Sequence, residues 1–265
     1  MCSIPTGVSP PIFVVGLPRS GSTLWARVLS SHPDVTLFAE MLFLTVWHRD
    51  FRYVLKHHVG DLSQEGNVAT LMETIFSPVP VVGMNQGFWF WHQIRDLGEK
   101  GLKESLYKRI MDSEDREIGT LFRIIIEEAT RIRGKNRAVV KFPVYPVYLE
   151  RLSEWCPESR IVHIIRDPRA LAASKTNDPA GVAGLIRRYP WMKSGFQFAG
   201  KYFSVFQYIL TSCVHSRFDG ASNYRVFQYE DLVSRPEKVI RELCEFCQLD
   251  FDEVMLNPSA GQASS

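Results

Sequence analysis

This chain has little capacity for disulfide chemistry, with only five cysteines among its 265 residues. An odd number of widely separated cysteines does not resemble the framework of a small secreted domain. Cys244 and Cys247 form a C-x-x-C motif, but it lies in an amphipathic stretch with no second pair or nearby histidine. Ordinary helix packing is therefore favoured there over zinc binding or redox use.

Long apolar runs and targeting signals are missing as well. No segment approaches 18 consecutive apolar residues, so the sequence predicts no membrane span. The amino terminus, MCSIPTGVSPP, lacks the basic start and apolar run of a signal peptide. A net charge of only +2 gives no reason to expect nucleic acid as a partner. We expect a soluble, cytoplasmic protein with one domain over residues 1–265, whose oligomeric state the sequence leaves open.

One more absence concerns a single lysine. The stretch VVGLPRSGSTLW, residues 14–25, resembles the P-loop pattern G-x-x-x-x-G-K-[ST], but Ser22 stands where that pattern has lysine. A glycine-rich turn at a helix amino terminus binds anions through its backbone N–H groups. The loop still suits a phosphate, with Arg19 as its cation and with hydroxyl donors on either side of Gly21. The alternative is an empty turn between a strand and a helix.

The pattern of apolar runs and helical spacing predicts an α/β protein. We expect a P-loop-like three-layer α/β/α fold with a central parallel sheet of about five strands and an inserted helical region at 42–135. The predicted strands are 12–16, 35–39, 137–141, 160–166 and 224–229. The predicted helices are 22–31, 145–156, one from residue 168, 200–218 and 236–249, with helical spacing also over 41–58 and 102–133.

A second constellation lies in RIVHIIRDPRALAASK, residues 160–175. Here a strand ends at Arg166, a helix begins at Pro168, and Ser174 follows about two helical turns later. A side chain at the carboxyl end of such a strand lies at the crevice where open α/β sheets bind ligands. A surface turn containing arginine and aspartate would give the same local pattern. This motif therefore indicates a binding site only in combination with the loop at residues 14–25.

Together, PRSGST and RDPRALAAS resemble the sulfotransferase family, in the branch that includes tyrosylprotein sulfotransferases and many bacterial enzymes. SHPDV, VVKFP and YEDLVSRPEKVIRELCEFCQLDF add to the resemblance, which covers about residues 12–252. It implies 3′-phosphoadenosine 5′-phosphosulfate (PAPS) as the sulfuryl donor, no metal, and an acceptor that carries a hydroxyl group. The residues expected to hold the 5′-phosphosulfate are Arg19, Ser20, Gly21, Ser22 and Thr23. Arg166 and Ser174 are expected to bind the 3′-phosphate.

The resemblance also implies catalytic roles for Glu40, Lys141 and Arg19. Glu40 follows the strand VTLFA and would be the general base, with a carboxylate that stabilises a helix start as the alternative. Lys141 ends the strand RAVVK and would stabilise charge that develops on the transferred group, a role that Arg19 could share. The alternative for Lys141 is a solvated lysine at a strand end. His92 would be the next candidate for the base.

Several features carry less information. The aromatic cluster in GFWFWHQ, residues 87–93, favours core packing over an acceptor pocket. Residues 176–201 predict a flap over the nucleotide, a binding strip for an acidic acceptor, or a solvated loop. Relatives usually continue beyond NPSAGQASS into a basic or tryptophan-containing tail, so either this tail is absent or the sequence is truncated at Ser265. The other function classes are an ATP-dependent P-loop kinase and a catalytically impaired nucleotide-binding protein of the same fold.

Overall fold

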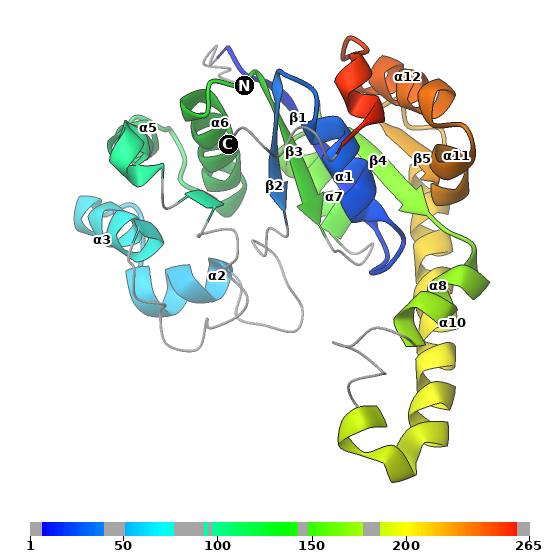
Figure 1. Ribbon diagram of the computed structural model, residues 1–265. Helices are drawn as coiled ribbons and strands as arrows, with labels where there is room; N and C mark the ends of the chain where they lie inside the picture. Colours follow the sequence, from blue (N-terminus) through cyan, green and yellow to red (C-terminus); the bar gives the residue numbers. More distant parts are fainter. Residues whose placement is uncertain are drawn as a thin grey trace.

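The computed structural model describes residues 7–39, 51–76, 93–94, 97–142, 148–176 and 186–258. In these ranges a five-stranded parallel sheet has the order β2-β3-β1-β4-β5. The strands are β1 Ser9–Gly16, β2 Val35–Ala39, β3 Arg137–Phe142, β4 Arg160–Ile165 and β5 Tyr224–Gln228. The chain first builds outward from β1 to β2 on one side and later to β4 and β5 on the other (Figure 1). The strand order therefore reverses at β1, which is where such sheets bind ligands.

Helices cover both faces of the sheet, so its central strands are apolar on both sides. Ile12 and Val14 of β1 pack with α1 Ser22–Ser30 and α12 Pro236–Cys247. Phe13 and Val15 point to the other face and pack with α6 Ile118–Ile132 and α7 Leu149–Trp155. Alternate residues of a strand point to opposite faces, so the unbroken run IFVV becomes the middle layer of an α/β/α sandwich. The fold class expected from the sequence is confirmed.

The remaining helices extend the sandwich in two directions (Figure 1). Beside α6 lie α2 Phe51–Val54, a π-helical turn Leu55–Val59, α3 Glu65–Phe76, a second π-helical turn Gly98–Leu102 and α5 Lys103–Met111. At the β5 edge, α8 Pro168–Thr176 packs against α10 Lys193–Phe218, which follows the 3₁₀ turn Pro190–Met192. Two short elements, α11 Tyr229–Ser234 and the 3₁₀ turn Glu253–Leu256, complete the described chain.

The structure corrects several sequence-based boundaries. The helical stretch expected over 102–133 is two helices, because Arg116 donates hydrogen bonds to the carbonyls of Ile110 (3.0 Å) and Met111 (3.2 Å) and thereby ends α5. The prediction of a loop over 176–201 is wrong from Lys193 onward, because α10 has already begun there.

Cys244 and Cys247 are buried in the core beside α1, which confirms their packing role. Burial raises the pKa of the Cys247 thiol to about 12.

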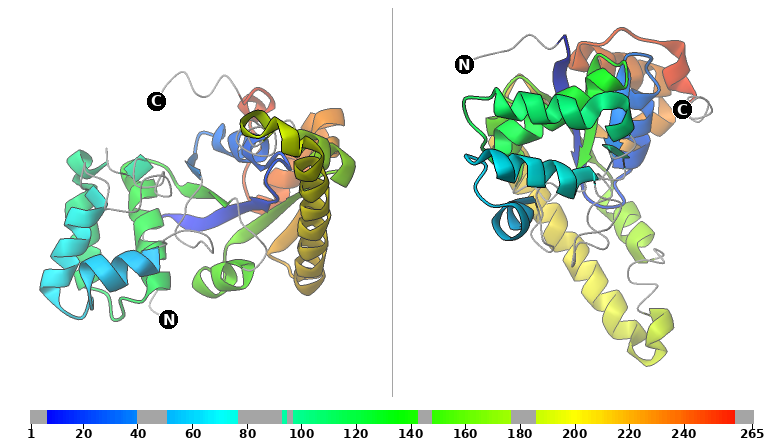
Figure 2. Two further views of the ribbon diagram at one scale, coloured as in Figure 1. Left: turned by 90° about the horizontal axis from the view of Figure 1, so that it is seen from below. Right: turned by 90° about the vertical axis from the view of Figure 1, so that its left-hand side faces the viewer.

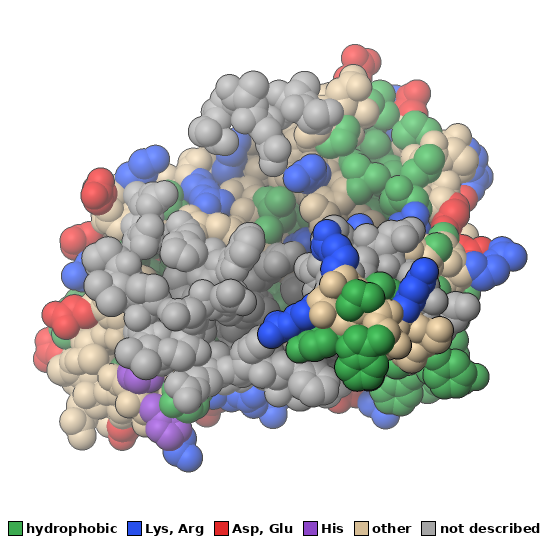
Figure 3. Space-filling model, turned by 60° about the horizontal axis from the view of Figure 1, so that its bottom comes forward, with side chains coloured by type: hydrophobic (Ala, Val, Ile, Leu, Met, Phe, Trp, Pro, Cys, Tyr) green, Lys and Arg blue, Asp and Glu red, His purple; other side chains and the backbone are tan. Residues whose placement is uncertain are grey.

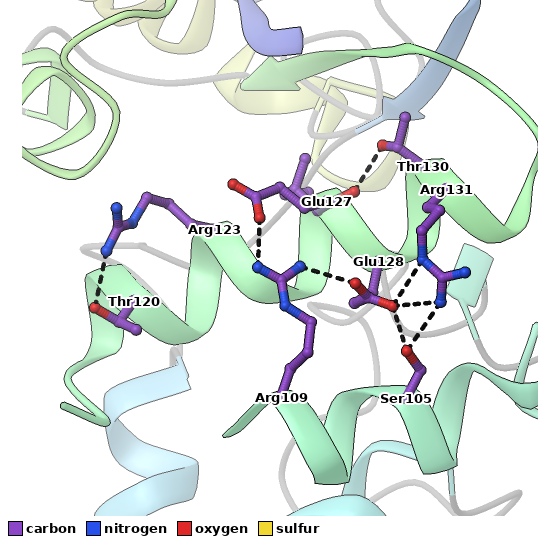
Figure 4. Close-up of polar contacts among 9 residues, drawn as sticks. Ser105, Arg109, Thr120, Arg123, Glu127, Glu128, Thr130 and Arg131 are labelled. Carbon is purple, nitrogen blue, oxygen red and sulfur yellow. Dashed lines mark hydrogen bonds and ion pairs between the residues drawn. The ribbon is translucent and has the colours of Figure 1, made fainter. Parts of the chain in front are cut away.

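A buried ion-pair cluster fixes α5 against α6 (Figure 4). The Glu128 carboxylate accepts from Arg109 Nη1 at 2.8 Å, from Arg131 Nη2 at 2.7 Å and from the hydroxyl of Ser105. Arg109 also pairs with Glu127 at 2.7 Å. Burial alone would raise the pKa of Glu128, but the hydrogen bonds from Arg131, Ser105 and Arg109 together lower it. Glu128 therefore remains ionised and is matched by two cations.

Replacing Glu128 by glutamine is expected to lower the free energy of unfolding by about 2 kcal/mol. Removing one partner of a buried pair costs about 3–5 kcal/mol, but Arg131 is half exposed and is solvated when unpaired. Urea unfolding of the variant measures the loss. Glu237→Gln is the matched control, because Glu237 makes an exposed pair with Arg241, and it should cost less than about 1 kcal/mol. Equal losses in the two variants would contradict a structural role for the cluster.

Candidate nucleotide and sulfuryl-transfer site

The loop between β1 and α1 has the backbone of an anion cradle. Ser20 N–H donates to the Leu17 carbonyl at 2.9 Å, and both Arg19 (φ 74°) and Gly21 (φ 94°) take left-handed conformations. Gly21 caps α1 without a side-chain hydrogen bond. The first N–H groups of a helix lack the usual partners within the helix. That of Leu24 donates to the Gly21 carbonyl at 2.8 Å, which leaves those of Ser22 and Thr23 for an anion. The strand–loop–helix predicted from the sequence is thus present.

Three of the predicted binding residues meet at this loop. Arg19 Nε donates to Ser174 Oγ at 3.2 Å, which joins the loop to α8 across 155 positions of sequence. Arg166, which directly follows β4, donates from Nη1 to the Arg19 carbonyl at 3.1 Å. The two arginines and the serine therefore form one cluster at the carboxyl edge of β1 and β4. Coulomb repulsion between two neighbouring guanidinium groups favours an anion between them.

Lys141 reaches the same loop from the opposite side. Its side chain is buried at the end of β3, and Nζ donates to Thr23 Oγ1 in the first turn of α1 at 2.8 Å. Strand alternation accounts for this direction, since Val139 of β3 packs on the α1 face and Lys141 lies two residues further along. The ammonium group of Lys141 thus adds a second positive charge to the site, at the amino terminus of α1. Because the side chain is buried, the alternative of a solvated lysine is excluded.

Sequence reasoning assigned no role to Tyr229, which shapes the site. Its ring lies under the Arg166 guanidinium, with 4.3 Å between the guanidinium carbon and the ring centroid. The same ring lies against Gly21, where an added Cβ would overlap it. The motif YEDL marked this position, but only the packing shows that Tyr229 positions both the loop and Arg166. Next to it, Glu230 accepts from the Asp167 N–H at 3.1 Å and ties α11 to the start of α8.

Two buried polar atoms in the site have no hydrogen-bond partner among the described residues: Ser20 Oγ and Arg166 Nε. Buried donors that lack a partner are costly and call for a ligand or water. Gly16 leaves room for the Ser20 hydroxyl, since a Cβ there would lie 2.7 Å from it. The donor set of hydroxyls, guanidinium groups and a helix amino terminus fits a phosphorylated or sulfated ligand. No cluster of three His, Cys, Asp or Glu side chains in the described ranges could hold a metal ion.

Two predicted residues lie outside the described residues: Glu40 and His92. The strand before Glu40 is placed, however. β2 ends at Ala39, whose register partner on β3 is Lys141. Parallel strands end at the same edge, so β2 leads the chain to the edge that carries the site. The general-base role of Glu40 stays a prediction.

Comparison with known proteins identifies the family. The model described as "Sulfotransferase family" matches residues 10–253. The chain belongs to the sulfotransferase family. Its match extends from β1 to the start of the last described 3₁₀ turn, so both arginine-bearing motifs lie inside it. The resemblance inferred from the sequence is confirmed.

Individual relatives of this sulfotransferase-family chain are distant. It is 26% identical over 176 residues to omega-hydroxy-beta-dihydromenaquinone-9 sulfotransferase Stf3 of Mycobacterium tuberculosis, covering 60% of this chain and 42% of the relative. It is 23% identical to an uncharacterized protein of Aquifex aeolicus, covering 93% of this chain and 26% of the relative. The chain thus spans between about a quarter and two fifths of the length of these curated relatives.

Among solved structures, the sulfotransferase domain of the Synechococcus PCC 7002 olefin synthase matches with a TM-score of 0.53 and 20% identity, covering 95% of this chain and 77% of that one. The sulfotransferase domain of the curacin biosynthetic pathway matches with a TM-score of 0.50 and 19% identity, covering 95% of this chain and 78% of that one. At these identities the likeness shows a shared fold.

Gly21→Ala is expected to damage the site far more than backbone strain alone would. A left-handed residue with a Cβ costs about 1–2 kcal/mol, and here the Cβ also displaces Tyr229 and with it Arg166. Gly101 is the matched control, because it has a similar φ of 88° with nothing near its added Cβ. Thermal unfolding and titration with 3′,5′-adenosine bisphosphate measure both variants. Gly101→Ala should lose stability only, and Gly21→Ala should also lose more than about tenfold in affinity. Normal affinity in Gly21→Ala would refute the coupling through Tyr229.

Proposed function

We propose that this protein transfers the sulfuryl group of PAPS to the hydroxyl group of an acceptor. The observation that carries the proposal is the cluster of Arg19, Arg166 and Ser174 around an anion-binding loop at the strand-order switch of the sheet. Family membership supports the reaction class. A fold of this kind hosts many chemistries, so the choice of donor rests on the residues of the site.

The charges of the site favour PAPS over a nucleoside triphosphate. A triphosphate P-loop has its lysine in the first turn of the helix, where this chain has Ser22. Here the lysine comes from β3 instead, with Lys141 Nζ against Thr23. Arg166 and Ser174 add donors on the other side of the loop, where the 3′-phosphate that distinguishes PAPS from ATP would bind. In this proposal the loop from Arg19 to Thr23 holds the 5′-phosphosulfate.

The chemistry assigned to the residues is an in-line transfer. The acceptor oxygen forms a bond to sulfur as the bond between sulfur and the bridging phosphate oxygen breaks. Glu40 takes the hydroxyl proton, and 3′,5′-adenosine bisphosphate leaves. Lys141 and Arg19 stabilise the charge that develops on the bridging and equatorial oxygens, and both are held by hydrogen bonds before the reaction.

The acceptor is assigned to the inserted region 42–135. Its described part is mostly helical and lies on the β2 side of the sheet, away from β4 (Figure 1). Donor and acceptor would thus approach Lys141 from opposite sides of β1. The relative Stf3 is named for a hydroxylated menaquinone acceptor. A hydroxyl-bearing small molecule, glycan, lipid or peptide fits the same chemistry here.

Calorimetric titration with 3′,5′-adenosine bisphosphate, and with ATP–Mg²⁺ in parallel, tests the proposal. We expect micromolar binding of the bisphosphate, typical of a nucleotide substrate, and much weaker binding of ATP. Preference for ATP would overturn the sulfotransferase proposal in favour of a kinase. Binding of neither would mean that this chain does not form the donor site, and an acceptor panel would then be unjustified.

Arg166→Ala is expected to remove the preference for a 3′-phosphate. A hydrogen bond to a charged group contributes about 1.5–3 kcal/mol, so affinity for 3′,5′-adenosine bisphosphate should fall about 10- to 100-fold. Affinity for adenosine 5′-monophosphate should change much less. Arg169→Ala is the matched control, because Arg169 is exposed and paired with Asp167 at 2.6 Å in the same turn. Equal losses for the two nucleotides in Arg166→Ala would exclude Arg166 as the 3′-phosphate ligand.

A further inference from the structure

The long helix α10 is amphipathic in the reverse of the usual sense. Its outward face carries apolar side chains at helical spacing: Phe198, Tyr202, Val205, Phe206 and Ile209. Each is more than half exposed, and Phe198 and Tyr202 contact each other with ring centroids 4.3 Å apart. The face turned to the protein is polar and buried, with Ser204, Gln207 and Thr211. A surface helix in a globular protein normally has the opposite arrangement.

The hydroxyl groups on the inner face of α10 are hydrogen-bonded within the helix. The apolar outward face is therefore the one available for contact with another molecule. Ser204 Oγ donates to the Gly200 carbonyl at 2.8 Å, and Thr211 Oγ1 donates to the Gln207 carbonyl at 2.9 Å. These hydroxyls are satisfied by the helix itself, so the face can pack against the protein, where α8 contacts it. Large exposed apolar patches of this kind mark sites of protein or membrane contact.

The turn before α10 continues this surface with aromatic and basic side chains. Trp191 is 81% exposed, and Tyr189 and Met192 beside it are also exposed. Arg187, Arg188 and Lys193 are exposed around them. Apolar side chains bordered by basic ones are visible at the end of the molecule that comes forward in Figure 3. Figures 1 and 2 show that α10 carries this end away from the sheet, and the described segment beside its tip is the short helical stretch at residues 186–192 that precedes it.

The charge of the segment decides between possible partners. Residues 179–218 contain no Asp or Glu, and they contain five basic residues: Arg187, Arg188, Lys193, Lys201 and Arg217. Two copies pressed together through α10 would bring like charges together with no acidic residue from either segment to balance them. Tryptophan, tyrosine and basic side chains on an apolar helix face are instead typical of a helix that lies in the headgroup region of a membrane.

We propose that the outward face of α10 and the turn at residues 189–192 bind an anionic lipid surface. The apolar side chains would enter the headgroup boundary, and the basic side chains would contact lipid phosphates. No helix in the described part of the chain is long and apolar enough to cross a bilayer, so contact is at the surface. The proposal is independent of the sulfuryl donor, although α8, which carries Ser174, would connect this surface to the nucleotide site.

Co-sedimentation with vesicles tests this proposal on the full chain. Vesicles of phosphatidylcholine are compared with vesicles that also contain phosphatidylglycerol, at low and high salt. We expect binding to the second kind only, weakened by salt. In the bound state the fluorescence of Trp191 should shift to shorter wavelength, and Trp191→Phe identifies that contribution among the six tryptophans.

Matched variants separate the apolar and the electrostatic components of vesicle binding. Phe198→Ser combined with Phe206→Ser should weaken binding at least about tenfold, whereas Val233→Ser, at an exposed valine of α11, should not. Lys193→Glu should weaken it about fivefold or more, whereas Lys238→Glu on α12 should have little effect. All of these side chains are exposed, so the variants are expected to fold, as thermal unfolding will show.

Three results would overturn the proposal. One is the absence of binding to either kind of vesicle. Another is binding that the Phe198 and Phe206 substitutions leave unchanged. The third is a stable dimer in light scattering that those substitutions dissociate, because α10 would then be an interface between two copies of the chain.

Discussion

Glu40→Gln is expected to lower the turnover number about 10²- to 10⁴-fold while the affinity for 3′,5′-adenosine bisphosphate stays within about twofold. A positioned general base contributes that range to a rate, and an amide cannot accept the acceptor proton. The backbone of the site supports this position. β2 ends at Ala39 opposite Lys141, and Lys141 contacts the first turn of α1. Glu40 directly follows Ala39 in the sequence, and Ala39 ends β2 at the edge of the sheet where transfer is proposed.

The measurement is single-turnover sulfate transfer across pH, with nucleotide affinity determined separately. His92→Asn is the comparison, since His92 is the other base that the sequence offers. If Glu40 is the base, Glu40→Gln should lose the acidic limb of the pH profile and His92→Asn should keep it. A near-normal rate in Glu40→Gln together with a lost limb in His92→Asn would transfer the role to the histidine.

Short-range signals made much of the site predictable from sequence. The short apolar run before PRSGST, rich in β-branched residues, predicts a strand that opens into a tight turn, and the run before RDPRALAAS has the same form. Parallel strands bring such turns to one edge, so Arg19 and Arg166 were expected together, and the Nη1 contact to the Arg19 carbonyl bears this out. The role of Lys141 was implied only by the family resemblance, and the structure adds that its strand lies beside β1.

Other features depend on contacts that no local pattern encodes. Tyr229 begins a short helix, and its role arises from one ring packed between Gly21 and Arg166, more than 60 residues away in either case. α3 lies within the region 42–135 that was expected to be helical, but its bounds were not predicted, because EGNVATLMETIF mixes small and polar residues with its four buried ones. α10 was expected to begin at 200 rather than Lys193, since its periodicity is that of an exposed apolar face with a polar face buried. Sequence-based rules for helices assume that the apolar face is buried and the polar face is exposed.

Lys141→Met is expected to lower the turnover number about 10²- to 10³-fold, the typical loss when one preorganised stabiliser of transition-state charge is removed. The affinity for 3′,5′-adenosine bisphosphate should fall much less, because that product lacks the transferred group. Methionine has a similar length and no charge, so the buried position at the end of β3 remains filled. Single-turnover transfer gives the chemical step, and calorimetry gives the affinity.

Two controls make the role of Lys141 specific. Lys238→Met removes an exposed lysine on α12 and should leave both constants unchanged. Thr23→Val removes the hydroxyl that accepts from Nζ but leaves the ammonium group in place. If Lys141 acts through charge, Thr23→Val should lower the turnover number about 10-fold or less, because the cation stays in the site and only its orientation and one hydroxyl donor to the nucleotide are lost. If Thr23→Val costs as much as Lys141→Met, or if Lys141→Met loses affinity and rate equally, the lysine acts by holding the loop. Charge stabilisation would then belong to Arg19, whose Nε is already fixed by Ser174 on the far side of the same loop.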